Sequence, residues 1–286
     1  MRRFLLGVVV LLLVGATACT NRVKKVEQTI ERWVEEKTAP APAPQEEDTV
    51  VIPVEEPEPV VENESFDDFL YEYASEEDFR AKRTKFPLPF YKYDEPLKVE
   101  VEEWNELSFF GEDESYSLIF DREEDLELEA DASLNSIQFE WINLSIMEVT
   151  KYYFERIKGR WMLEAVNLRA LEENDNEDFV RFYQRFATDP VYQQQHVKDP
   201  LTYITVDPEN EFSIVESFID AEQWPAFCPV IPTERLSNII YGQQNNNDSN
   251  RKIMKLTGVA DGLSNVLFFR RVNGEWELYK FEDTSV

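Results

Sequence analysis

The sequence predicts an α+β fold of two tandem units, each with two helices followed by a bent antiparallel sheet. Three observations support this expectation. Aromatic residues recur at helical spacing in two stretches 113 positions apart, apolar residues alternate with polar ones after the first stretch, and Lys-Gly and Asn-Gly turns are flanked by apolar runs. Helices that precede a run of strands in this way are typical of α+β domains.

The leading helices are predicted from apolar residues at positions i, i+3, i+4 and i+7. We expect Ser65 and Asn176 to be their N-caps. A second short helix is expected near 76–85 and near 189–198, each ending before a Pro-Leu pair. The predicted buried face of the leading helix consists of Phe66, Phe69, Leu70 and Tyr73 in the first unit, and of Phe179, Phe182, Tyr183 and Phe186 in the second unit.

Strands are expected after the first helix pair. Residues 125–131 alternate apolar residues with acids, which predicts a strand whose acids face water. Ile137, Phe139 and Trp141 alternate in the same way. The acids between Asp121 and Asp131 would then protect an edge strand from pairing with other chains, with a cation site as the alternative.

Two hairpins are predicted at Lys158-Gly159 and Asn273-Gly274, because such dipeptides favour tight turns between strands. The surrounding runs 154–161 and 269–276 match at a shift of 115 and end in Trp161 and Trp276. We expect both tryptophans in the core, and the alternative is that they line a pocket.

The matching stretches indicate a duplication. Residues 66–88 shifted by 113 meet 179–201 with six identities. We therefore expect a first α+β repeat over 65–171 and a second over 172–286. The residues before them are expected to be a lipoprotein signal peptide over 1–18 and a lipid-anchored helix and Pro/Glu-rich linker over 19–64. The alternative is a chance match between two amphipathic helices.

The N-terminus is typical of a bacterial secretory signal. Two arginines precede an eleven-residue apolar run, which is shorter than the roughly 20 residues that span a bilayer. Ala16-Thr17-Ala18-Cys19 is similar to a lipobox, so we expect cleavage after Ala18 and acylation of Cys19. A plain signal peptide is the alternative. The absence of Asp after Cys19 favours the outer membrane, with the protein facing the periplasm.

The segment after Cys19 is predicted to be a tether. Residues 22–37 have apolar positions at helical spacing, which fits an interfacial or partner-binding helix or a solvated spacer. Residues 38–64 contain six prolines and eight acids but no Lys or Arg. Proline and like charge both extend a chain, so this stretch is expected to be a semi-rigid linker.

Composition excludes some functions. The chain has 286 residues and a net charge of −29, which makes nucleic acid a poor partner because phosphate binding needs clustered Lys and Arg. Its 43% hydrophobic content is enough for a core. With Cys19 acylated, Cys228 is the only thiol left and no internal disulfide can form.

No residue set predicts catalysis, a metal or a cofactor. His196 is expected on a solvated helix and Cys228 in a packed apolar segment, the alternative being a nucleophile and base pair. The acids of 172–178 are expected at a solvated boundary, with a Ca²⁺ loop as the alternative. Residues 243–250 are expected to form a flexible polar loop.

The order of helices, meander and final hairpin resembles the cystatin-like cone of the nuclear-transport-factor-two (NTF2) superfamily. The lipobox, the Pro-rich tether, Phe86-Pro87-Leu88 and the duplication are similar to an uncharacterised family of bacterial lipoproteins, a domain of unknown function with that fold. The resemblance implies a fold more than an activity, because the superfamily contains enzymes and non-enzymes. It also implies that the two repeats pair internally as a pseudo-dimer.

The expected function is a non-catalytic interaction or ligand-binding module on a membrane, with an envelope protein or a small molecule as its partner. One alternative is an isomerase- or dehydratase-like enzyme with an Asp, Tyr or His inside a cone. Another is a structural envelope spacer. An acid with a raised pKa deep in a cone would favour the enzyme, and a cone filled by its own aromatic residues would count against it.

Overall fold

In the part of the chain that the structure describes, the strands form two six-stranded sheets and the helices are few and short, so the fold is mixed α+β. The computed structural model describes residues 64–105, 115–131, 133–258 and 262–285. The helices are α2 Phe66–Ser75, α3 Glu77–Lys82, α4 Val101–Asn105, α5 Glu177–Thr188, α6 Pro190–Gln195 and α7 Trp224–Phe227, with 3₁₀ helices η1 Glu123–Ala130 and η2 Leu171–Glu173. The strands are β1 Leu88–Lys92, β2 Glu95–Val99, β3 Ser115–Phe120, β4 Ser136–Asn143, β5 Glu148–Ile157, β6 Arg160–Ala170, β7 Val197–Asp207, β8 Asn210–Ile219, β9 Arg235–Ile240, β10 Arg251–Gly258, β11 Ser264–Val272 and β12 Glu275–Asp283.

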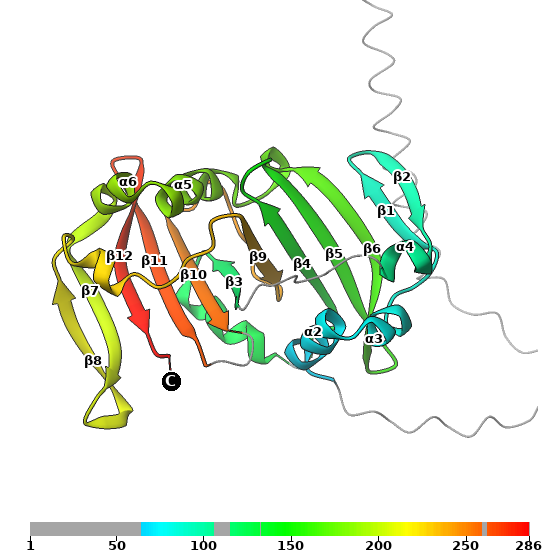
Figure 1. Ribbon diagram of the computed structural model, residues 1–286, viewed down its shortest axis with the longest axis horizontal. Helices are drawn as coiled ribbons and strands as arrows, with labels where there is room; N and C mark the ends of the chain where they lie inside the picture. The colour runs from blue at the N-terminus through cyan, green and yellow to red at the C-terminus, as the bar shows by residue number, and fades with distance from the viewer. Residues whose placement is uncertain (1–63, 106–114, 132, 259–261, 286) are drawn as a thin grey trace, which may run out of the picture. The chain divides into compact units, whose positions relative to one another are not determined.

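Each sheet contains one strand from the other half of the chain. The first sheet has the order β2-β1-β6-β5-β4-β9, and the second has the order β3-β10-β11-β12-β7-β8 (Figure 1). Read from its other end, the second order is β8-β7-β12-β11-β10-β3. If β1 to β6 are matched with β7 to β12 in chain order, the two strand orders then agree, except that β3 and β9 have changed places. We call β3 and β9 the crossed strands.

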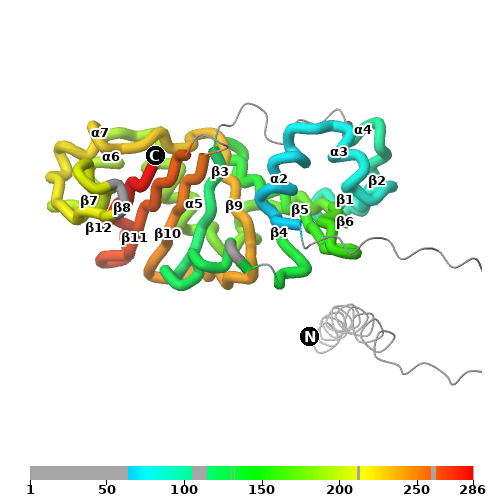
Figure 2. The backbone as a smooth tube through the Cα atoms, turned by 90° about the horizontal axis from the view of Figure 1, so that it is seen from below, coloured from blue at the N-terminus to red at the C-terminus, as the bar shows by residue number. Residues whose placement is uncertain are grey.

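The registers of the crossed strands correspond as well. Ile119 of β3 lies opposite Met254 of β10, and Ile239 of β9 lies opposite Phe139 of β4. All of these pairings are antiparallel. Viewed from below, β3 and β9 run next to each other between β10 and β4 (Figure 2). The junction of the two sheets is therefore formed by two strands from distant parts of the sequence.

The predicted leading helices are confirmed as α2 and α5. Each turns the expected aromatic face inward, and the short helices α3 and α6 follow as predicted. Ser65 and Asn176 occupy the N-cap positions, but neither side chain makes a capping hydrogen bond. The Asn176 side-chain oxygen instead accepts a hydrogen bond from the Lys252 ammonium at 2.7 Å. In Figure 1, α5 and α6 lie along the upper edge and α2 and α3 along the lower edge.

The predicted hairpin turns are also confirmed. Lys158 and Gly159 have φ angles of 50° and 82° between β5 and β6, and Asn273 and Gly274 have 54° and 89° between β11 and β12. Two successive positive φ values define a type I′ turn, whose twist suits a two-residue hairpin. Glycine adopts this conformation without a steric penalty, which explains its second position in both turns.

Two hydrophobic cores are shared between the halves of the chain. The core around α2 includes Ile239 and Phe268 from the second half. The core around α5 includes Ile119, Ile142 and Val149 from the first half. Burial of one such aliphatic or aromatic side chain stabilises a fold by about 1.5–3 kcal/mol. The crossed strands and their neighbours therefore link the two cores energetically.

The strand predicted over 125–131 is wrong, because this stretch belongs to the 3₁₀ helix η1. The buried Asp125 carboxylate pairs with the Arg122 guanidinium three residues earlier at 2.7 Å. A helical turn brings such residues together, whereas a strand separates them by about 10 Å. Leu126 and Leu128 both pack against the core around α2. The predicted strand through Ile137, Phe139 and Trp141 is confirmed as β4.

Candidate functional site

A groove of about 560 Å³ opens where the crossed strands meet. Ser115 and Ser117 of β3 line it, together with Arg235 and Ser237 of β9. Other walls come from β4, from the chain between α7 and β9, and from the ends of β11 and β12. Its volume falls within the range of about 300–1,000 Å³ typical of small-molecule sites. The groove is thus built from both halves of the chain.

Hydrogen bonds hold the crossed strands at the base of the groove. The Ser117 backbone N–H donates to the Ser237 hydroxyl at 2.7 Å, and the Ser117 hydroxyl donates to the Ser237 carbonyl at 2.7 Å. The Ile119 N–H donates to the Asn238 side-chain oxygen at 2.9 Å. These side chains take the place of a regular ladder between two strands that belong to different sheets. They fix the shape of the groove floor.

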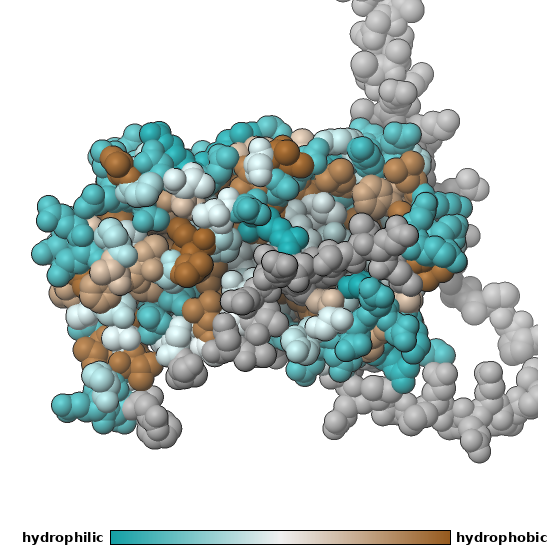
Figure 3. Space-filling model, in the orientation of Figure 1, coloured by the Kyte–Doolittle hydropathy of each residue, from teal (hydrophilic) through white to brown (hydrophobic). Residues whose placement is uncertain are grey.

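One wall of the groove is apolar. It consists of Phe227 and the chain from Pro229 to Pro232, where the Tyr183 hydroxyl donates to the Pro232 carbonyl at 2.9 Å. The Val230 side chain at the mouth is 93% exposed. Figure 3 shows apolar surface beside the segment that runs from α7 to β9. Proline fixes the backbone φ angle, so this wall is stiff without regular secondary structure.

The opposite wall presents polar groups. Asn265 is only 2% exposed, and its amide nitrogen donates to the Ser285 hydroxyl at 3.1 Å. Its side-chain oxygen has no hydrogen-bond partner. The Arg235 guanidinium lies 4.1 Å from the centre of the Trp141 ring, which orients the charge by a cation–π contact. A buried acceptor without a partner is costly, so a ligand donor would be favoured if the side chain turned this shielded oxygen toward the groove.

The apolar and polar walls of the groove together suit ligand binding better than covalent chemistry. An apolar wall and a few converging polar groups are the usual composition of a ligand site. Neither His196 nor Cys228 lines the groove. Among the described residues, no group of three or more His, Cys, Asp or Glu side chains is arranged to hold a metal ion.

The spaces between each leading helix and its sheet are filled by aromatic residues. Phe66 packs edge-to-face on Phe154 and Trp161, with ring centres 5.5 and 5.2 Å apart. Phe179 makes the matching contacts with Phe269 and Trp276 at 5.2 and 5.5 Å. Edge-to-face pairs add about 0.5–1.5 kcal/mol each beyond their burial.

Trp161 and Trp276 lie in these aromatic clusters and not at the groove. The Trp161 indole N–H donates to the Glu64 carbonyl at 3.1 Å, and the Trp276 indole N–H donates to the Asp178 carboxylate at 2.7 Å. An arginine guanidinium covers each ring, at 4.5 Å for Trp161 and 4.6 Å for Trp276. Both tryptophans are buried, and neither lines the groove.

His196 and Cys228 occupy structural positions. The His196 ring stacks on the Tyr192 ring with centres 3.8 Å apart, and its Nδ1 lies 2.8 Å from the Tyr192 carbonyl oxygen. Cys228 packs against the core around α5. Burial raises the pKa of the Cys228 thiol to about 11, so the reactive thiolate is rare at neutral pH.

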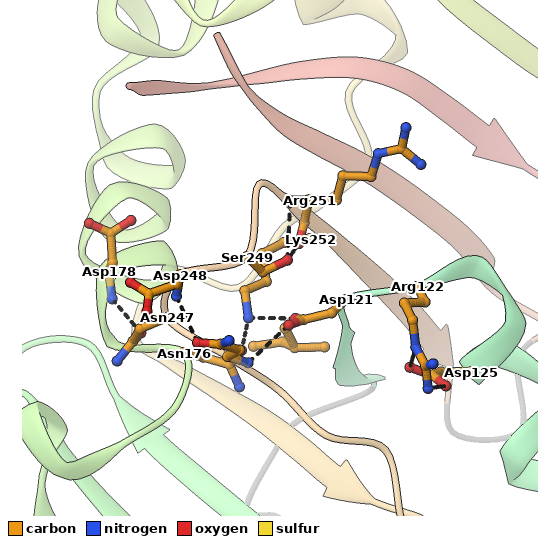
Figure 4. A network of polar contacts seen from close by, with 12 residues as sticks. Asp121, Arg122, Asp125, Asn176, Asp178, Asn247, Asp248, Ser249, Arg251 and Lys252 are labelled. Atoms are coloured by element: carbon orange, nitrogen blue, oxygen red, sulfur yellow. Dashed lines mark hydrogen bonds and ion pairs between the residues drawn. The ribbon is translucent and has the colours of Figure 1, made fainter. Parts of the chain in front are cut away.

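Three of the seven acids between Asp121 and Asp131, namely Asp121, Asp125 and Glu129, are largely withdrawn from solvent in ion pairs, whereas the other four are exposed as expected of a charged face. The Lys252 ammonium, 1% exposed, lies 2.5 Å from the Asp121 carboxylate (Figure 4). The Lys255 ammonium lies 2.5 Å from the Glu129 carboxylate. Burial lowers the pKa of Lys252, and the hydrogen bond that its ammonium donates to Asp121 opposes that shift. The sequence pattern shows charge but cannot reveal these partners, which lie more than 100 positions away.

The boundary 172–178 and the loop 243–250 are packed against each other, and the boundary acids Glu172, Glu173, Asp175 and Asp178 are exposed, as expected. The Asn247 amide donates to the Asn174 carbonyl at 3.0 Å, and the Asp178 N–H donates to the Asn247 side-chain oxygen at 3.2 Å. Both Asn174 and Gln243 are buried. Their amides hydrogen-bond with backbone groups at the start of α5 and the end of β9, which accounts for these two polar residues in the interior.

Comparisons place this α+β chain among known proteins. The family described as a domain of unknown function (DUF4348) matches residues 46–283, so the chain belongs to this family. A crystal structure described as that of an NTF2-like protein from Bacteroides fragilis NCTC 9343 is 50% identical and covers 80% of this chain and 100% of its own, with a TM-score of 0.75. No curated protein matches the chain. The predicted resemblance to an uncharacterised family with an NTF2-like fold is confirmed.

The predicted signal peptide, Ala18, Cys19 and the linker up to residue 63 lie outside the described residues. In the described ranges, the helices are all too short or too polar to span a membrane. Sequence reasoning did not find Asn265, Arg235 or the Ser117 and Ser237 pair. These residues meet only through strand pairing, and no local motif marks them.

Proposed function

We propose that this chain is a lipid-anchored protein of the bacterial cell envelope that binds a small ligand without transforming it. Its folded part would be two tandem NTF2-like repeats that exchange β3 and β9. The matched strand orders support the repeats, and the matched contacts of Trp161 and Trp276 support them independently.

The groove at the crossed strands is the observation that carries the binding function. It combines an apolar wall with the unpaired Asn265 oxygen and the Arg235 guanidinium. A ligand with an apolar body and a hydrogen-bond donor complements these features. The groove exists only because two distant strands meet, so its shape depends on the whole folded part.

A non-catalytic role is favoured over an isomerase- or dehydratase-like enzyme. Aromatic side chains fill the spaces beneath α2 and α5, where such an enzyme would need an open pocket. Burial raises the pKa of Asp67, and the Tyr241 hydroxyl donates to its carboxylate at 2.8 Å. Asp67 nevertheless keeps contact with solvent on the first turn of α2, while its carboxylate reaches the buried Tyr241, and it does not line the groove.

The membrane anchor is proposed from the sequence. Acylated Cys19, after cleavage at Ala18, would hold the protein to the outer membrane facing the periplasm. The Pro/Glu-rich linker would then place the groove away from the lipid surface, since like charges and prolines extend the chain. Intact mass measurement of membrane-extracted protein tests this: we expect an acylated chain that begins at Cys19, and an unacylated chain that begins at residue 19 would contradict it.

Native mass spectrometry of the intact protein, extracted gently from its own envelope, tests the binding function. We expect a bound species below a kilodalton. Val230→Asp places a charge at the mouth of the groove and should lose this species, whereas Val191→Asp, at a 66% exposed site on α6, should keep it. A bare wild-type mass, or equal occupancy in both variants, would contradict the proposal.

A further inference from the structure

A second cavity, of about 410 Å³, lies on the other face of β4 and is lined almost entirely by polar side chains. Gln138 and Glu140 point into it because they alternate along β4 with the core residues Ile137 and Phe139. We call this cavity the polar cleft. Residues 174–176 and 243–245 close it from the other side.

A buried carboxylate organises the polar cleft. Glu140 is 2% exposed, and its two oxygens accept hydrogen bonds from the Gln138, Asn174 and Asn238 amides at 2.8, 3.2 and 3.1 Å. The Lys151 ammonium lies 3.4 Å from the same carboxylate. These contacts hold the amides in fixed directions, so the cleft is preorganised before any ligand enters.

The neighbouring network fixes the opposite wall. The side-chain oxygen of Asn176 accepts a hydrogen bond from Lys252, which also contacts Asp121 (Figure 4). The Asn247 amide ties the loop after β9 to Asn174. The wall is thus anchored on both sides by buried polar contacts.

Asn245 is the unsatisfied member of the polar cleft. Its amide oxygen and amide nitrogen are both shielded from solvent, and neither has a hydrogen-bond partner. The residue borders the cleft, so a turn of its side chain would bring one donor and one acceptor toward a ligand. A hydroxyl group both donates and accepts, and it matches this pair better than a charged group does.

The charge of the lining excludes anions as preferred ligands. Glu140 and Asp175 contribute two negative charges against the single positive charge of Lys151. The remaining polar side chains are amides, which pair with neutral donors and acceptors alike. We propose that the polar cleft binds a neutral polyhydroxylated ligand of the carbohydrate class, held by Asn245 and by the amides around Glu140. This site is separate from the groove at the crossed strands.

Saturation-transfer NMR of the full acylated chain, in a detergent without a sugar headgroup, tests this site. The probes are glucose, galactose and N-acetylglucosamine at millimolar concentration, with acetate as the anionic comparison. We expect saturation transfer to at least one sugar and none to acetate. Absence of transfer to all three sugars, with the protein folded, would overturn the proposal.

Matched variants locate the binding. Asn245→Ala removes an amide that makes no hydrogen bond in the folded chain, so folding should be unaffected. We expect it to weaken sugar binding about tenfold, the effect of losing one well-placed hydrogen bond. Asn250→Ala, at an exposed position in the same loop, should bind as the wild type does. Equal affinity in both variants would overturn the assignment to this cleft, and unchanged sugar binding in Val230→Asp would show that the two sites are independent.

Discussion

Ser117 and Ser237 bind each other at the point where β3 and β9 cross. The Ser237 hydroxyl accepts from the Ser117 N–H at 2.7 Å and donates to the Ser117 carbonyl at 2.9 Å. Both serines are almost fully buried. The two residues occupy corresponding positions, since Ser117 lies opposite Leu256 of β10 and Ser237 lies opposite Trp141 of β4.

Removal of the Ser237 hydroxyl should destabilise the whole folded part. Ser237→Ala leaves the Ser117 N–H and carbonyl buried without partners, so we expect a loss of about 1–3 kcal/mol in the free energy of unfolding. Urea denaturation measures it. The control Ser145→Ala, at an exposed turn, should change stability by less than about 0.5 kcal/mol.

The two halves of the chain should not fold separately. A fragment of residues 64–171 lacks β9 and the part of its core that comes from Ile239 and Phe268. Its β3 also lacks β10, its partner in the sheet. We expect circular dichroism to show a largely unfolded fragment, while residues 64–286 fold cooperatively. A fragment with a sharp thermal transition would show that the strand crossing is dispensable.

Asp121→Ala should be more damaging than the loss of both partners of its ion pair. It leaves the Lys252 ammonium buried without a countercharge, which costs about 3–5 kcal/mol. In the double variant Asp121→Ala/Lys252→Met this uncompensated charge is absent, so part of the stability should return. Denaturant midpoints show which of the two variants is more stable. A double variant that is less stable than Asp121→Ala would contradict the prediction.

Cys228 should resist alkylation in the folded protein. Its pKa of about 11 leaves on the order of one thiolate in a thousand at pH 8. We expect iodoacetamide to modify it at least about 100-fold more slowly in the native state than in guanidinium, as followed by mass spectrometry. Rapid modification of the native protein would show that the thiol is accessible and activated.

Glu129 should make stability fall as the pH rises through its titration. Burial is the main cause that raises the pKa of Glu129 above its ordinary value of 4.5. The folded chain therefore binds this proton more tightly than the unfolded chain does, so the contribution of Glu129 is greatest below pH 4.5 and is lost as the pH rises through the raised pKa.

Carboxyl NMR titration measures the pKa of Glu129 directly. The midpoint of Glu129 should lie above 4.5, whereas Asp131, whose pKa is lowered by hydrogen bonds from Ser133, should titrate below its ordinary value of 3.8. Thermal unfolding at several pH values should show a smaller pH dependence in Glu129→Gln than in the wild type. An identical pH profile in the two proteins would contradict the assignment.

Local structure was largely predictable from the sequence. The helical spacing of Phe66, Phe69 and Tyr73 and the glycines of the two hairpins each encode a conformation within a few residues. The exception is 125–131, where a 3₁₀ helix with the Arg122 and Asp125 ion pair forms in place of the predicted strand. A period-two pattern in a short acidic stretch does not distinguish these two cases.

The candidate site was not predictable, because its parts come together only through long-range pairing. Ser117 and Asn265 carry no local signal, and the groove depends on which sheet each of β3 and β9 enters. Both arrangements place similar residues at several corresponding positions, such as Ser117 with Ser237 and Ile119 with Ile239, although Leu118 corresponds to Asn238. Only the three-dimensional pairing selects between them.

Disulfide cross-linking tests the exchange of β3 and β9 most directly. Ser115 lies opposite Gly258 of β10, and in a non-exchanged fold it would lie opposite Asn143 of β4, which pairs with Arg235 of β9 instead. Directly opposed residues in antiparallel strands have Cα atoms about 4.5–5.5 Å apart, within the range of a disulfide. In a Cys228→Ser background, we predict that Ser115→Cys/Gly258→Cys cross-links on mild oxidation and that Ser115→Cys/Asn143→Cys does not. The reverse result would show that each half of the chain keeps its own strand.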